Sequence, residues 1–267
     1  LFHIYLVTLS RNMFVDMLPA RLGELSYIAM LNRGYKVSGE SCVSSLAISF
    51  VFDLIALGVL MSILLVLQAV GGDFQSWMAG VVLVLILLIL FLIFLLYPAT
   101  ALANRVIGRI AWLQRGLAGK VSNLLLRIER ALHDSRKAGI TGRLLGLSVG
   151  VRAAKYFGLY FLFIGVAAQF PEMSTSIAQV LSALISAEAG ASLPVPAFMG
   201  FGTYEAGGTL ALTVLGASAS MSLMVMLAMH VISQVVDYLL GGIGLVLFIM
   251  KTGGGVLETK SARQFSW

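Results

Sequence analysis

The sequence predicts an all-α polytopic membrane protein, a helical bundle with two broken, re-entrant helical hairpins arranged as an inverted repeat. Of the 267 residues, 59% are hydrophobic and only 11% are charged, whereas roughly a quarter of the residues in a soluble domain are charged. Four apolar runs reach the length of about 20 residues that a spanning helix needs, and prolines and glycines interrupt two further apolar stretches. This composition excludes a soluble globule, a disordered chain and a secreted module built on disulfides.

Metal and nucleic-acid chemistry are also disfavoured. Cys42 is the single cysteine, which rules out an internal disulfide and any CxxC site. The three histidines, His3, His133 and His230, are too far apart for a short-spacing zinc motif. A net charge of +6 in so apolar a chain favours basic loops against anionic lipid headgroups over nucleic acid. We therefore expect no metal, no cofactor and no nucleic-acid partner.

The beginning of the chain does not resemble a signal peptide. It opens inside an apolar run at Leu1, without a charged segment before the run or a small-residue cleavage site after it. We expect residues 1–250 to form a single transmembrane domain that is incomplete at its N-terminus. Residues 251–267 are then a cytoplasmic tail.

Four runs are predicted to span the membrane: residues 42–70, 77–96, 144–170 and 219–250. The second contains no charged residue at all. Residues 42–70 carry Asp53, residues 144–170 carry Arg152 and Lys155 in their first turns, and residues 219–250 carry His230 and Asp237.

The most basic part of the chain lies between the second and third runs. Residues 104–155 hold eleven lysines and arginines against two acidic residues, Glu129 and Asp134. Apolar residues recur there at helical spacing, which predicts one or two amphipathic helices in the membrane interface, with a solvated connecting loop as the alternative. The positive-inside rule places residues 104–143 in the cytoplasm. The remaining loops then agree in charge, with residues 171–176 outside and residues 251–267 inside.

Two apolar stretches are interrupted and are too short on each side to cross. They are residues 12–25 and residues 177–216. In the second stretch about 15 helical residues precede the break and about 12 follow it, and at roughly 1.5 Å per residue neither half reaches across the roughly 30 Å of a bilayer core. The second stretch is predicted to enter from the outer face and return to it. The helix-breaking residues are Pro19, Gly23, Pro194, Pro196, Gly200 and Gly202.

The two breaks share a loose pattern of Leu-Pro, then glycine, then glutamate. Three spanning helices separate them, so equivalent motifs would face opposite leaflets, as an inverted repeat predicts. In transporters, interrupted segments in corresponding positions mark a binding site near the midplane.

The motifs carry a resemblance to a known family. Residues 18–25 (LPARLGEL), Phe52-Asp53-Leu54 and residues 193–206 (LPVPAFMGFGTYEA) resemble the lysylphosphatidylglycerol synthase transmembrane (flippase-like) family, over most of residues 1–250. The resemblance implies a stand-alone member without the soluble synthase domain, with a role in moving lipids with large headgroups between leaflets. We expect an integral protein of the bacterial inner (cytoplasmic) membrane.

Ionisable side chains inside a membrane are expensive and face a bundle interior or water. The candidates for a substrate or ion path are Arg21, Glu24, Asp53, Glu205, His230 and Asp237.

Each candidate also has a purely structural interpretation. Arg21 and Glu24 could form an internal pair, and Asp53 could lock helices together by binding Arg21 or Arg11. Glu205 could cap a helix. His230 and Asp237 share one helix face with Gln234, which fits a packed polar stripe as well as a relay.

The leading hypothesis is a lipid flippase or transporter whose path is lined by these side chains. The alternative is a non-transporting membrane subunit or scaffold of a larger complex. An enzyme is not expected, since the sequence has no HExxH and no Ser/His/Asp set at a recognisable spacing. The expected partners are membrane lipids, with other membrane subunits or a second copy of the chain as further candidates.

Overall fold

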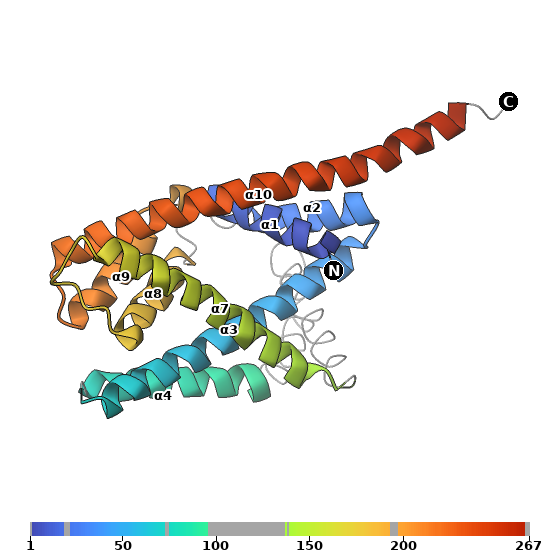
Figure 1. The fold of residues 1–267 in the computed structure, drawn as a ribbon. Helices are drawn as coiled ribbons and strands as arrows, with labels where there is room; N and C mark the ends of the chain where they lie inside the picture. Colours follow the sequence, from blue (N-terminus) through green and yellow to red (C-terminus); the bar gives the residue numbers. More distant parts are fainter. Residues whose placement is uncertain are drawn as a thin grey trace, which may run out of the picture. The chain divides into compact units, whose positions relative to one another are not determined.

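The structure is a computed structural model that describes residues 2–18, 22–72, 75–95, 137, 139–192 and 197–264 (Figure 1). Every regular element in these ranges is helical, which confirms the predicted all-α class. The elements are α1 (Phe2–Met17), α2 (Glu24–Tyr35), α3 (Gly39–Val70), α4 (Ser76–Leu90), η2 (Phe91–Leu95), α7 (Thr141–Ala167), α8 (Ile177–Ala191), η3 (Phe198–Gly200), α9 (Thr203–Val214) and α10 (Ala219–Gln264).

Several residues on which predictions were made lie outside the described residues. They are Pro19, Arg21, Pro194, Pro196 and nearly all of the basic stretch at 104–143.

Three of the described helices are long and apolar enough to cross a membrane: α3, α7 and the Ala219–Thr252 part of α10. They correspond to the predicted runs 42–70, 144–170 and 219–250, with ends that differ by three residues in α3 and α7. In the C-terminal run, α10 continues past residue 250 to Gln264. The length and the apolar composition of these helices therefore indicate an integral membrane protein.

The predicted span at residues 77–96 differs from expectation in its regularity. The α-helix α4 has 15 residues and is followed directly by five residues of π-helix, Phe91–Leu95. The run is therefore helical over nearly its predicted length, but its α-helical part alone is shorter than the roughly 20 residues of a full crossing.

Short helices flank both predicted breaks. The second break lies between α8, with 15 residues, and α9, with 12, which are the lengths that the sequence predicts on either side of it. The first break lies between α1, with 16 residues, and α2, also with 12. At roughly 1.5 Å per residue, none of these helices exceeds about 24 Å. The two breaks thus sit in closely similar helical surroundings.

The chain forms two compact units. One comprises Leu1–Cys42, Phe161–Thr175 and Ser186–Trp267, and the other comprises Val43–Tyr160 and Ser176–Ile185.

In the first unit, α1 packs along α10 with α2 beside it (Figure 1). Glycines allow this close approach, because a Cβ on Gly241 would collide with Met13 and one on Gly244 would lie 3.0 Å from the Cβ of Leu9. A core of buried side chains joins these three helices to the first turn of α3: Leu6, Val7, Met30, Leu31, Cys42 and Phe248. The core fixes α1 and α2, the helices on either side of the first break, against α10.

In the second unit, a buried glutamine ties α3 to the beginning of α8. The amide nitrogen of Gln68 donates to the hydroxyl of Ser182 at 2.8 Å and to the carbonyl of Ala178 at 3.1 Å. Gly58 lets α3 approach α4 closely, since a Cβ there would lie 3.2 Å from the side chain of Ile89.

Candidate functional site: two buried carboxylates beside the helix breaks

Each break is followed by a buried glutamate near the start of the next helix. Glu24 is the first residue of α2 and is 8% exposed, and Glu205 is the third residue of α9 and is 4% exposed. A carboxylate in such a position has to be paired or hydrogen-bonded, because an unpaired buried charge costs several kcal/mol, in order of magnitude. The partners of the two glutamates therefore define the site.

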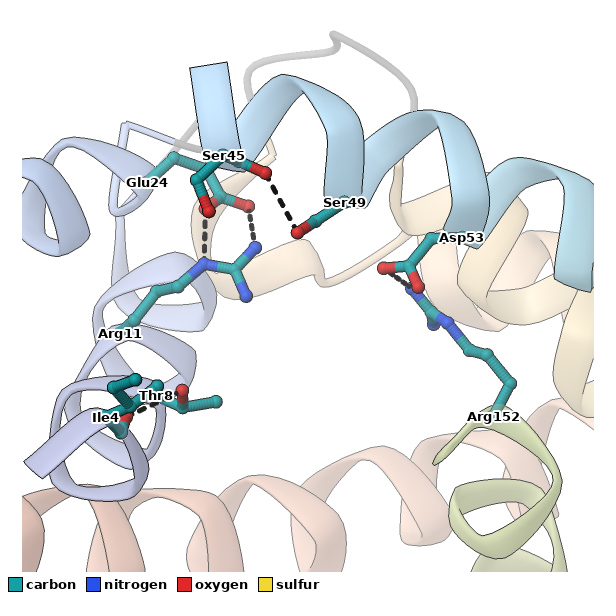
Figure 2. Close-up of polar contacts among 8 residues, drawn as sticks. All are labelled: Ile4, Thr8, Arg11, Glu24, Ser45, Ser49, Asp53 and Arg152. Carbon is teal, nitrogen blue, oxygen red and sulfur yellow. Dashed lines mark hydrogen bonds and ion pairs between the residues drawn. The ribbon is translucent and has the colours of Figure 1, made fainter. Parts of the chain in front are cut away.

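At the first break, Glu24 is held by an arginine of α1. The guanidinium of Arg11 donates from Nε to Oε2 at 2.5 Å and from Nη2 to Oε1 at 2.6 Å (Figure 2). This is the two-pronged geometry that makes arginine–carboxylate pairs strong and specific. The preceding residue, Gly23, lies so close to the backbone of Phe14 that no side chain fits there. Glycine at this position therefore brings α2 against α1 and the carboxylate within reach of Arg11.

The partner of Glu24 in the described structure is thus Arg11, thirteen residues upstream. An internal pair of Glu24 with Arg21, the structural alternative that the sequence left open, is not tested. Arg21 itself lies outside the described residues.

At the second break, the backbone enters the left-handed region at three positions. Gly200 has a φ of 74° and Gly202 a φ of 89°, as expected for glycines predicted to break the helix, and Met199, the middle residue of η3, has a φ of 56°. A non-glycine residue in this region is strained by roughly 1–3 kcal/mol and persists only where its surroundings hold it. The hydrogen bonds made by the peptide groups of the break therefore show what holds Met199 in this conformation.

Glu205 both caps α9 and binds a side chain of α10. Its Oε2 accepts the backbone N–H of Gly202 at 2.7 Å, and its Oε1 lies 2.6 Å from Nδ1 of His230. The predicted capping role is thus real, but it uses only one of the two carboxylate oxygens. The other oxygen joins the break to α10.

The hydrogen-bond chain continues through α10 and returns to the break. Nε2 of Gln234 lies 2.8 Å from Nε2 of His230 and donates to the carbonyl oxygen of Met199 at 2.6 Å. Both His230 and Gln234 are 6% exposed. The strained residue of the break is therefore held by a buried chain that runs from Glu205 through His230 to Gln234.

Aromatic rings enclose the histidine. The rings of Phe201 and Tyr204 lie with their centroids 4.6 and 4.5 Å from that of His230, at interplanar angles of 34° and 33°. Gly200 faces the other edge of the imidazole, where an added Cβ would lie 3.7 Å from Nε2. The imidazole is thus surrounded by the break and the first turn of α9.

Asp53 is paired within the second unit. Its Oδ2 accepts from Nη2 of Arg152 at 2.9 Å, joining α3 to α7 (Figure 2). The helix-to-helix link that the sequence allowed for Asp53 is therefore present, with Arg152 as the partner. Of the two partners considered from the sequence, Arg11 binds Glu24 and Arg21 lies outside the described residues. Sequence alone could have suggested Arg152, since it is a charge within another predicted span and needs a partner for the same reason.

The polar stripe predicted on α10 is present in part. His230 and Gln234 are hydrogen-bonded to one another at the i, i+4 spacing, as one helix face requires. Asp237, a turn further along, is partly exposed.

An open groove of about 580 Å³ lies between α9 and α10, beside Glu205. Its walls are mainly apolar and include the exposed side chains of Leu210 and Leu223. Thr209 also lines it, and its hydroxyl oxygen is buried with no hydrogen-bond partner among the described residues. The groove therefore leads from lipid-like walls to a few polar atoms at Glu205 and Thr209.

The described part of the chain contains no cluster of three or more histidine, cysteine, aspartate or glutamate side chains that could hold a metal ion. The polar chemistry of the site rests on carboxylates, a histidine, an amide and arginines.

Comparison with known protein families identifies a match over most of the chain. The family described as the lysylphosphatidylglycerol synthase TM region matches residues 1–241. The matched stretch includes both breaks and all of the polar residues described above. Neither a curated protein nor a solved structure matches the chain.

Proposed function

The chain belongs to the lysylphosphatidylglycerol synthase TM-region family, and on that premise we propose that it moves a lipid with a polar phospho- or glyco-headgroup between the leaflets of a bacterial inner membrane. The family is a membrane domain associated with lipid synthesis and with flippase-like roles. Of these two roles, we propose lipid movement for the present chain and no reaction of its own.

The observation that carries the proposal is the buried hydrogen-bond chain at the second break. Glu205, His230 and Gln234 are all at most 6% exposed, yet they lie beside an open groove between α9 and α10. Polar and ionisable groups within membrane helices are costly and typically mark a substrate or ion pathway. A scaffold would be expected to fill such a position with apolar side chains.

The groove has the properties that a lipid path requires. Its apolar walls suit an acyl chain, and the Glu205 carboxylate beside them offers hydrogen-bond acceptors to a headgroup. Irregular backbone at membrane depth is tolerated where it lines such a cavity. If the two breaks form the inverted repeat that the sequence predicts, Glu24 and Glu205 belong to equivalent sites that open toward opposite leaflets.

The test uses purified protein in liposomes that contain a fluorescent phospholipid, with a membrane-impermeant reductant that bleaches the outer leaflet. Wild-type protein should let nearly all of the fluorescence bleach, whereas protein-free liposomes lose about half. Glu205→Gln should insert normally and slow this movement at least about tenfold, which corresponds to roughly 1.4 kcal/mol in the barrier.

The matched control is Glu172→Gln, a change of the same kind at an exposed glutamate between α7 and α8. It should move lipid at the wild-type rate. Equal bleaching with and without wild-type protein would contradict the proposal and favour a non-transporting subunit of a larger membrane complex. A Glu205→Gln protein as fast as wild type would contradict the assignment of the path.

A further inference from the structure

One amide nitrogen at the second break serves two acceptors. Nε2 of Gln234 lies 2.6 Å from the carbonyl oxygen of Met199 and 2.8 Å from Nε2 of His230. An amide oxygen in that place would face the carbonyl oxygen acceptor to acceptor, so the nitrogen is the atom that fits. An amide nitrogen only donates hydrogen bonds. Nε2 of His230 must therefore accept, which means that it carries no proton.

The bare Nε2 of His230 determines where the protons lie on His230 and Glu205. A neutral imidazole with a bare Nε2 carries its proton on Nδ1, which donates to Oε1 of Glu205 at 2.6 Å. The second carboxylate oxygen accepts the N–H of Gly202. Every donor then meets an acceptor when His230 is neutral and Glu205 is ionised. In this state the Glu205–His230 pair carries one negative charge.

We propose, building on the lipid transport proposed above, that Nε2 of His230 is a proton-binding site and that its protonation releases residues 197–202 of the second break from α10. A proton taken from water forms a bond to the Nε2 lone pair and turns the imidazole into imidazolium. The new N–H then points at the N–H of Gln234, donor to donor. When the amide rotates to accept the new N–H, its oxygen turns toward the carbonyl oxygen of Met199, acceptor to acceptor, and the bond to Met199 is lost.

Loss of this hydrogen bond affects Met199, the strained residue of the break. Met199 has a left-handed φ of 56°, and the bond from Gln234 is one of the side-chain contacts that hold the break in place. Thr203 supplies a second by donating to the carbonyl of Gly200 at 3.1 Å. Loss of the Gln234 bond frees a segment that is already strained and lies next to the groove. Proton uptake thereby becomes linked to movement at the proposed lipid path.

Negative charge and aromatic faces lie around the imidazole. The Glu205 carboxylate is bonded to it, and the rings of Phe201 and Tyr204 lie against it, where their faces attract a cation. Among the other acidic groups, Glu188 of α8 interacts electrostatically with Tyr204, and Asp16 of α1 and Asp237 of α10 interact in the same way with Tyr238.

A direct test follows the break itself. A nitroxide label is attached to Ala197→Cys in a Cys42→Ala background, in liposomes, and its mobile fraction is measured by electron paramagnetic resonance from alkaline to acidic pH. We expect the mobile fraction to rise severalfold on acidification. Gln234→Leu should make the label mobile at every pH, and His230→Gln should leave it immobile at every pH. A general loss of structure would make the label mobile in both variants, so the opposite results expected for Gln234→Leu and His230→Gln exclude it.

The matched control is Gln68→Leu, which removes another buried glutamine amide, one that binds Ser182 and Ala178 and no titratable group. It should leave the pH response of the label unchanged. A response that is absent in wild type, or that survives in His230→Gln, would overturn the proton site.

The lipid assay gives the second readout. On the alkaline limb of its pH profile, the wild-type rate should fall about tenfold per pH unit, because the protonated fraction of a single site does so. Gln234→Leu should flatten this slope and Gln68→Leu should keep it. Lipid movement at one constant rate across pH would overturn the proton site and leave the transport proposal intact. Absence of lipid movement at every pH would overturn the transport proposal, while the nitroxide measurement would still decide the proton site.

Discussion

Glu24 and Glu205 occupy comparable positions, each buried near the start of a 12-residue helix that follows a break, but their partners differ in kind. Glu24 is bound by two nitrogens of the Arg11 guanidinium, Nε and Nη2, and this group stays charged at any physiological pH. Glu205 shares its carboxylate between a backbone N–H and His230, which can change its charge. Similar helical surroundings can therefore hold two kinds of contact between helices. The Arg11–Glu24 contact at the first break is a permanent joint, and the Glu205–His230 contact at the second break is a joint that a proton can open.

The largest expected effect comes from breaking the permanent joint. Arg11→Met leaves Glu24 buried without its cation, and we expect the free energy of unfolding to fall by about 3 kcal/mol, the low end of the range for a broken buried pair, since the Arg11 side chain is 24% exposed. Thermal unfolding in detergent, followed by intrinsic fluorescence, measures the loss. Adding Glu24→Leu to Arg11→Met should recover most of it. If the double variant is no more stable than Arg11→Met alone, the charge pair is not what stabilises the first break.

A second prediction concerns the close helix approach beside the second break. A Cβ on Gly207 would collide with the carbonyl oxygen of Ser186 in α8, so Gly207→Ala should destabilise the protein by about 2 kcal/mol as the backbone shifts. Gly242→Ala is the control, because a Cβ at that helical position meets nothing within 4 Å. It should be neutral or slightly stabilising, since alanine favours a helix. Equal melting temperatures for the two variants would mean that α8 and α9 do not pack closely at Gly207.

The charged contact at the first break can also be made sensitive to pH by replacing Arg11 with a residue that titrates. In Arg11→His, the cation beside Glu24 would be present at low pH and lost as pH rises. The carboxylate raises the folded-state pKa of a histidine at this position above its unfolded value near about 6.5. Its contribution is therefore complete below that value and disappears as pH climbs through the folded-state pKa.

We expect the unfolding free energy of Arg11→His to drop by roughly 1 kcal/mol between about pH 5.5 and about pH 8, relative to wild type over the same range. Urea or thermal titrations at several pH values measure this difference. Parallel curves for the two proteins would show that Arg11 does not act through its charge.

The smallest expected effect comes from the hydrogen bond between Thr203 and Gly200 at the second break. Thr203→Val removes the hydroxyl that donates to the carbonyl of Gly200 and should cost about 1 kcal/mol or less. Since this bond involves no titratable group, the cost should be the same at every pH. A cost that changes with pH would place Thr203 within the proton-sensitive network.

Much of the fold is predictable from the sequence because hydropathy and length decide it. The bounds of α3 and α7 lie within three residues of the predicted runs, and α8 and α9 have the predicted lengths, because prolines and glycines interrupt the helices for local reasons. The π-helical turn at Phe91–Leu95 was not predictable in this way. Nothing in that apolar run marks a change of hydrogen-bond register.

The partners of the buried charges were much less predictable. Sequence patterns reveal pairs three or four residues apart on one helix, as with His230 and Gln234. Glu24 with Arg11, Asp53 with Arg152 and Glu205 with His230 are joined only once separate helices cross. Their separations in sequence, 13, 99 and 25 residues, carry no periodic signal. Met199, a non-glycine residue in a left-handed conformation, likewise has no sequence signature.

The most direct measurement of the difference between the two joints is the protonation of His230 itself. Protein labelled with ¹⁵N-histidine, with His3 and His133 replaced by glutamine so that a single histidine remains, can be observed by solid-state NMR in lipid bilayers. At neutral to alkaline pH, Nδ1 should carry the proton and Nε2 should be bare, and acidification should protonate Nε2 and shift the amide signal of Gln234. A neutral imidazole with its proton on Nε2, or an imidazolium that persists at every pH, would contradict the account.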